Sequence, residues 1–200
     1  IFVVIMIVYF IVLLLALARV EGKLKKLKDA LQWNGILRIS IIAFFPLAVY
    51  SILQLNNGAS NTSAEIASIL LAIVAVFYIL GIMVWIFIVL RKPTKILKSK
   101  EYESRYSTLY SHCNIDESAF ARYYNLIMLG RNLVMAIIIA FLSSVPVFQV
   151  VLLLVIDIVL MIKICTTSLF NKKSEKIFTV LQQGAIIVTE ILLIIFGAVT

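Results

Sequence analysis

The chain has 200 residues, of which 63% are hydrophobic and 14% are charged, and its formal net charge is +8. Its mean hydropathy is +1.10, whereas roughly half of the residues in an ordinary soluble domain are apolar. This composition excludes a water-soluble globular domain and predicts an integral membrane protein, whose length is best counted in spans of about 20 apolar residues.

Six apolar runs follow one another along the chain. They cover residues 1–18, 39–55, 66–90, 123–142, 147–169 and 177–199. Hydrocarbon offers no hydrogen-bond partner to a backbone N–H or C=O group, so each run is predicted to be a helix. The sequence therefore predicts an all-α integral membrane protein, a six-transmembrane-helix bundle that forms one module over residues 1–200. Because the chain begins inside an apolar run, we expect this module to belong to a longer polypeptide.

The basic residues predict the orientation of the bundle. Sixteen of the 18 Lys and Arg residues lie in the three connections that follow the first, third and fifth runs, and the two other connections contain none. By the positive-inside rule the three basic connections are cytosolic, so both ends of the chain are predicted to be extracytosolic. The sequon Asn61-Thr62-Ser63 lies in an outer connection and predicts glycosylation at Asn61. This topology favours the secretory pathway or the plasma membrane, the ciliary membrane included, over an organellar membrane.

The net charge of +8 raises the question of an anionic partner. The basic residues flank apolar spans on one side of the membrane, which is the arrangement that topology and anionic lipid headgroups require. We therefore expect the lipid bilayer and anionic headgroups on its cytosolic side as partners, with other membrane subunits as further candidates, and we expect no nucleic acid.

Residues suited to enzyme chemistry are few. The single histidine, His112, stands next to Cys113, and the other cysteine, Cys165, lies near the inner end of the fifth span. A structural zinc site needs four ligands, and the sequence contains no Gly-rich phosphate loop, HExxH or GxSxG pattern. The sequence predicts no enzyme activity, no cofactor and no metal site.

Four ionisable residues lie inside predicted spans, where such side chains usually face a partner or a water-filled cavity. They are Arg131, Asp157, Lys163 and Glu190. The fourth and fifth spans are joined by residues 143–146 alone, so they form an antiparallel hairpin in which residues equidistant from the tip lie at the same depth. Reflection of Arg131 about this tip gives position 158, next to Asp157, and we predict an ion pair at mid-membrane. Lys163 can extend to the inner interface, and spacing assigns Glu190 no partner.

Two interpretations of these polar groups remain open. In the first, which we favour, the pair of Arg131 and Asp157 only holds the hairpin together. In the second, polar side chains line a path for an ion or a solute. The groups that could do so are distributed from the outer to the inner half of the membrane, and they are Gln149, Asp157, Gln182 and Glu190.

A spaced pattern runs through the C-terminal half of the chain. It consists of Arg105-Tyr106-x-x-Leu109-Tyr110, Arg131 in an apolar run, Pro146-x-x-Gln149 at the start of the next span, Asn171-Lys172-Lys173, and Glu190. This pattern resembles the membrane region of the TRP-like family, which includes fungal flavin-carrier and calcium-related proteins and the C-terminal membrane modules of large protist ectodomain proteins. The resemblance implies a multi-span module associated with ion or solute transport and calcium handling.

Ion or solute transport is therefore the predicted function. The alternative is a non-conducting anchor or assembly subunit for a large extracellular domain or a membrane complex. The last two spans are joined on the predicted cytosolic side by a short basic turn, so a re-entrant selectivity filter of the voltage-gated type does not fit between them. If the protein conducts, its path is of another kind.

Overall fold

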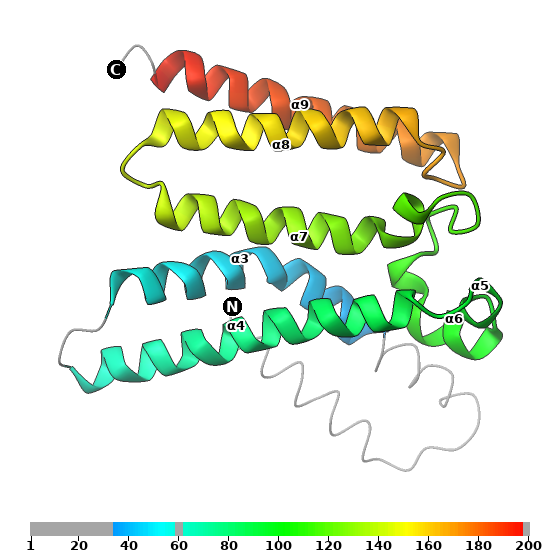
Figure 1. The fold of residues 1–200 in the computed structure, drawn as a ribbon, viewed down its shortest axis with the longest axis horizontal. Helices are drawn as coiled ribbons and strands as arrows, with labels where there is room; N and C mark the ends of the chain where they lie inside the picture. The colour runs from blue at the N-terminus through cyan, green and yellow to red at the C-terminus, as the bar shows by residue number, and fades with distance from the viewer. Residues whose placement is uncertain (1–33, 59–61, 198–200) are drawn as a thin grey trace.

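The computed structural model describes residues 34–58 and 62–197, and this part of the chain is helical (Figure 1). The first predicted span, residues 1–18, and the sequon residue Asn61 lie outside the described residues. The helices are α3 (Ile36–Asn57), α4 (Ser63–Leu90), α5 (Thr94–Leu97), α6 (Lys100–Tyr106), the 3-10 helix η2 (Ser107–Leu109), α7 (Ala119–Phe141), α8 (Pro146–Thr166) and α9 (Lys173–Gly197).

Five of the described helices, α3, α4, α7, α8 and α9, are long and apolar enough to cross a membrane. They correspond to the second to sixth predicted spans, with ends that differ by a few residues. At the ends next to the basic connections, α7 and α9 each begin four residues earlier than predicted. There α8 ends at Thr166 rather than at residue 169. It ends early because the chain leaves the helix there to form an isolated antiparallel bridge between Phe170 and Cys113.

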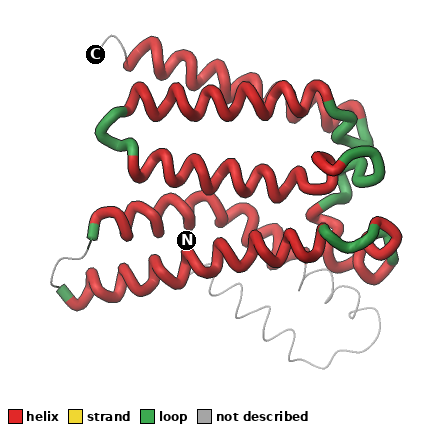
Figure 2. The backbone as a smooth tube through the Cα atoms, viewed as in Figure 1, coloured by secondary structure: helices red, strands yellow, loops and turns green. Residues whose placement is uncertain are grey.

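The five long helices run antiparallel to their chain neighbours, and their connections lie at two opposite ends (Figures 1 and 2). One end carries α5, α6, η2 and the connection from α8 to α9, and we call it the basic end because the Lys- and Arg-rich connections of the described chain lie there. The other end carries the short connection of residues 142–145. This arrangement brings positions that are far apart in the sequence to the same depth.

Packing within the bundle is uneven. Helix α3 packs closely on both α4 and α7, and α8 packs along α9, whereas α7 and α8 meet over fewer residues. The buried positions of α3 recur every three to four residues and include small side chains, which let helix backbones approach closely. They are Leu37, Ser40, Phe44, Ala48 and Ser51. The described bundle is thus a three-helix unit, α3, α4 and α7, joined to the two-helix unit of α8 and α9.

Polar side chains fasten the three-helix unit at several depths. The Ser40 and Tyr78 hydroxyls are 2.8 Å apart, Gln54 donates to the Ser68 hydroxyl at 2.9 Å, and the Asn56 amide donates to the backbone carbonyl of Ala140 at 3.1 Å. Large apolar side chains elsewhere on the long helices are exposed, for example Phe77 and Phe178. This distribution suits helices that present apolar side chains to lipid.

Candidate functional site

A buried ion pair joins α7 to α8 in the middle of the bundle. Nε of Arg131 donates to Oδ1 of Asp157 and Nη2 donates to Oδ2, both at 2.5 Å. The exposed fraction is 9% for the Arg131 side chain and 1% for the Asp157 side chain. The predicted contact between these two residues is confirmed. The two-point geometry is the strongest that a guanidinium and a carboxylate can form.

The hairpin places the two charges at one depth. α7 ends at Phe141 and α8 begins at Pro146, a residue that fits the first turn of a helix because it has no N–H to leave unpaired. Arg131 and Asp157 therefore lie at nearly equal distances from their helix ends, about 15 Å at a rise of 1.5 Å per residue. That depth corresponds to the centre of a hydrocarbon layer about 30 Å thick.

A second carboxyl group lies beside the pair. Glu190 of α9 is 6% exposed, and the Asp157 carboxyl group and the charge of Arg131 act on it electrostatically. Oε2 of Glu190 is enclosed and has no hydrogen-bond partner among the described residues. Three ionisable side chains from three helices therefore form one buried group, which we call the charge cluster: Arg131, Asp157 and Glu190.

The other predicted polar positions are not part of the charge cluster. Gln182 is exposed, and the glutamine that α9 buries is its neighbour Gln183, which is 3% exposed. Gln149 is partly exposed near the start of α8, and Lys163 is exposed near its end. Of the polar groups expected along the path, Asp157 and Glu190 are buried, and α9 buries Gln183 rather than Gln182.

The sequence contained the signal for Gln183. It lies seven residues before Glu190, which is two helical turns, so the two side chains share one face of α9. Nε2 of Gln183 is also enclosed and has no hydrogen-bond partner among the described residues. The inner face of α9 thus carries two polar groups that the described protein leaves unpaired.

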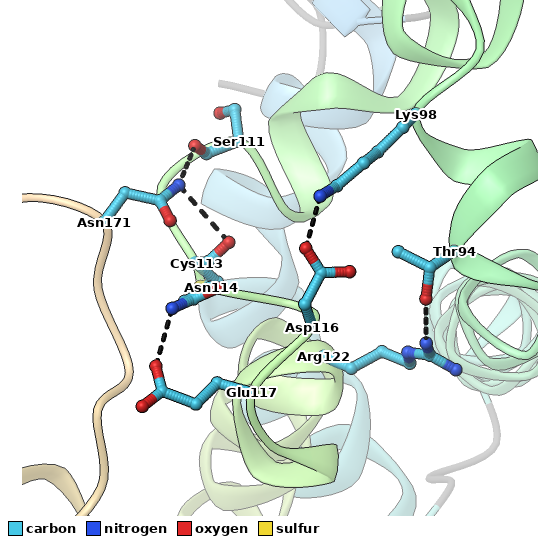
Figure 3. Close-up of polar contacts among 9 residues, drawn as sticks. All are labelled: Thr94, Lys98, Ser111, Cys113, Asn114, Asp116, Glu117, Arg122 and Asn171. Carbon is cyan, nitrogen blue, oxygen red and sulfur yellow. Dashed lines mark hydrogen bonds and ion pairs between the residues drawn. The ribbon is translucent and has the colours of Figure 1, made fainter.

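A second polar assembly lies at the basic end, where the connection before α7 meets the connection after α8 (Figure 3). The Asn114 N–H donates to the Leu169 carbonyl at 2.8 Å, and the Asn171 N–H donates to the His112 carbonyl at 3.1 Å. The Asn171 side chain donates to the carbonyls of Ser111 at 3.2 Å and Cys113 at 3.4 Å. These bonds hold the two connections together, and we call this region the basic-end junction.

Neighbouring side chains complete the junction. Lys98 pairs with Asp116, Arg122 donates to the Thr94 hydroxyl, and the Tyr110 hydroxyl donates to the Leu97 carbonyl at 2.6 Å. Burial raises the pKa of Tyr110 to about 12, with the charge of Glu103 acting in the same direction. The junction is therefore ordered by hydrogen bonds as well as by apolar packing.

Cys113 is buried in the junction. Burial raises the pKa of its thiol to about 11, and the negative charge of Glu175 acts in the same direction. Glu175 also contacts His112: the distance from Nδ1 of His112 to Oε1 of Glu175 is 3.2 Å. No group of three or more His, Cys, Asp or Glu residues that could hold a metal ion occurs among the described residues.

Comparison with known proteins places the chain in a family. The model of the Transient receptor potential (TRP) ion channel family matches residues 1–200, the full length of the chain. The chain belongs to the TRP ion channel family. The resemblance seen in the C-terminal half is thereby confirmed, and the chain is a membrane module related to ion channels, from a family that is generally non-enzymatic. No curated protein and no solved structure matches it.

Proposed function

We propose that this module moves ions across the membrane and that the charge cluster of Arg131, Asp157 and Glu190 lies on the route. The observation that carries the proposal is the second carboxyl group. An ion pair that served only to hold α7 against α8 would be complete with Arg131 and Asp157, whose polar atoms already meet at two points.

Glu190 adds a second acidic group to a site in which Asp157 already pairs with Arg131. Placing an ionisable side chain at the centre of a bilayer costs about 3 kcal/mol or more. Such residues are rare in spans and mark ion paths or proton relays more often than simple packing sites. The enclosed and unpaired Oε2 of Glu190 is a free acceptor at that depth, so the cluster has the capacity to hold a cation.

The test is ion flux in lipid vesicles that contain the purified full chain. Glu190→Gln keeps the size of the side chain and removes its ionisable group, and we expect it to reduce flux at least tenfold. Glu101→Gln is the matched control, because Glu101 lies outside the long helices in α6, is exposed and forms only an exposed ion pair with Arg105, which contributes little.

The control variant should conduct as the unchanged protein does. Equal flux in the unchanged protein, Glu190→Gln and Asp157→Asn, with all three folded by circular dichroism, would refute the proposal. That result would leave a non-conducting anchor or assembly subunit as the function of the module.

A further inference from the structure

The charges of the buried cluster do not balance. Arg131 supplies one positive charge, and Asp157 and Glu190 would supply two negative charges if both were ionised. Asp157 already uses both of its oxygens to accept from Arg131. The groups that act electrostatically on Glu190 are Asp157 of α8 and Arg131 of α7, so within the described bundle no second basic residue compensates the second carboxylate.

Two adjacent carboxylates that face one guanidinium are unstable in a dry interior. Like charges at close range in a low dielectric repel strongly, and paired carboxyl groups in other proteins resolve this by sharing one proton. A direct hydrogen bond between two carboxyl groups also requires that one of them carry a proton, because a carboxylate can only accept. Asp157 is the charged neighbour that acts most strongly on Glu190, so a shared proton would satisfy both carboxyl groups.

The nature of the missing positive charge follows from the ligands. A metal ion needs several oxygen, nitrogen or sulfur ligands, and the described residues provide no group of three or more acidic, His or Cys side chains suited to one. Oε2 of Glu190 is a single enclosed oxygen without a donor. One proton satisfies the charge balance and needs only one oxygen to bind.

Gln183 is a second buried polar group on the face of α9 that carries Glu190. Its amide is 3% exposed, lies two turns from Glu190 toward the basic end on the same face of α9, and has an unpaired Nε2. A buried amide donor without a protein acceptor is the kind of group that a buried water satisfies. Gln183 and Glu190 are therefore two buried polar groups on one face of α9, with Ile186 and Ile187 between them.

We propose that Glu190 and Asp157 form an intramembrane proton-binding site, in which one proton is held by Glu190 and donated in a hydrogen bond to Asp157. Binding forms the O–H bond of Glu190 from its carboxylate and a proton from water, and release breaks that bond and returns the proton to water. The proton-binding site itself does not depend on the proposed function. Only the role of the proton in ion movement rests on that function.

The test of the site itself is infrared spectroscopy of the full chain in vesicles at neutral pH. Exposed carboxyl groups are ionised at this pH, so a C=O stretching band of a protonated carboxylic acid that shifts in deuterium oxide reports a buried one. We expect this band in the unchanged protein and in Glu101→Gln, and we expect its loss in Glu190→Gln.

The Asp157→Asn variant distinguishes two origins of the infrared band: a proton shared by Glu190 and Asp157, and a Glu190 that is neutral by itself. Once Asp157 is neutral, Glu190 is the only carboxylate available to Arg131, so it should ionise and the band should disappear although Glu190 is present. Absence of the band from the unchanged protein, or its persistence in Asp157→Asn, would overturn the shared-proton site.

Flux measurements then separate the two proposals. Both proposals are supported if the band is lost in Glu190→Gln and in Asp157→Asn and if proton flux, reported by a pH-sensitive dye, falls at least tenfold in Glu190→Gln. The same spectra with unchanged flux of protons and metal cations keep the proton site and refute ion movement through the module. Reduced potassium flux in Glu190→Gln without the infrared band keeps the proposed function and refutes the proton site.

Discussion

Removing Arg131 should destabilise the protein more than removing Asp157, because the cluster contains two acids and one base. In Arg131→Met the carboxyl groups of Asp157 and Glu190 lose the positive charge that faces both. An unpaired charge at the centre of a span costs about 3 kcal/mol. In Asp157→Asn, by contrast, Glu190 is in place to act as the new counter-ion of Arg131.

The expected magnitudes follow from this asymmetry. Arg131→Met should lose about 3 kcal/mol of stability, which is roughly a hundredfold change in the unfolding equilibrium. Asp157→Asn should lose about 1 kcal/mol, the typical contribution of a hydrogen bond. The double variant should be less destabilised than Arg131→Met alone, because it removes the orphaned Asp157 charge together with its partner.

The assay is equilibrium unfolding in mixed detergent micelles, followed by circular dichroism as the denaturing detergent increases. Gln182→Leu is the control, because Gln182 is exposed and is not part of the cluster. Its transition should lie close to that of the unchanged protein. Equal losses in Arg131→Met and Asp157→Asn would refute the role of Glu190 as a substitute counter-ion, and a double variant less stable than either single variant would refute the pairing argument.

Three further predictions concern the two ends of the bundle. Cys113 should resist maleimide at pH 8, since a pKa raised from 9.0 to about 11 lowers the thiolate fraction about a hundredfold. The reaction should accelerate as the pH rises toward 11 or when the protein is denatured. Rapid labelling of the folded protein at pH 8 would contradict the burial of Cys113. Asn171→Ala removes the donor to the Ser111 and Cys113 carbonyls and should cost about 1 kcal/mol per bond, with faster amide hydrogen exchange over residues 107–118, whereas exchange within α3 should stay unchanged. Glycosidase treatment of the full chain made in eukaryotic cells should reduce its mass through Asn61, and cytosolic labelling of a cysteine placed at Ser60 would contradict the predicted orientation.

The spacing of one hairpin was enough to predict the ion pair. The connection between α7 and α8 is short, so the register of the two helices follows from counting residues away from it. Arg131 and Asp157 are nearly equidistant from that connection, and opposite charges in hydrocarbon have few alternatives to pairing. Hydropathy and helix geometry alone are therefore enough to predict this contact.

The same counting fails for Glu190. Reflection about the middle of the connection between α8 and α9 places Glu190 opposite Gln149, about two turns from Asp157. Side chains in a helix lean toward its N-terminus. Because α8 and α9 run in opposite directions, Asp157 and Glu190 lean toward each other, which shortens the distance between their carboxyl groups. Residue counting treats side chains as points at the backbone level and misses this contact.

The basic-end junction was beyond sequence reasoning for a different reason. Its bridge between Cys113 and Phe170 joins two irregular segments, and neither segment has the alternation of apolar and polar residues that predicts a strand. The hydrogen bonds of Asn114 and Asn171 go to backbone carbonyls, which every residue possesses. Nothing in the residue types selects one carbonyl over another, so only the path of the chain determines the partners.

The unit formed by α8 and α9 is joined to the rest of the bundle by polar contacts as well as by apolar packing. Helices α7 and α8 meet over fewer residues than α3 shares with α7 or α8 with α9, and lipid competes effectively with apolar side chains for any helix surface. The unit is attached by the ion pair of Arg131 and Asp157 at mid-depth, by Leu160 and Ile164 of α8 in the common apolar core, by the backbone bonds of the junction at one end and by a short connection at the other. A change in the charge of the cluster therefore acts where α7 and α8 meet over few residues, and we expect it to alter how α8 and α9 sit against α7.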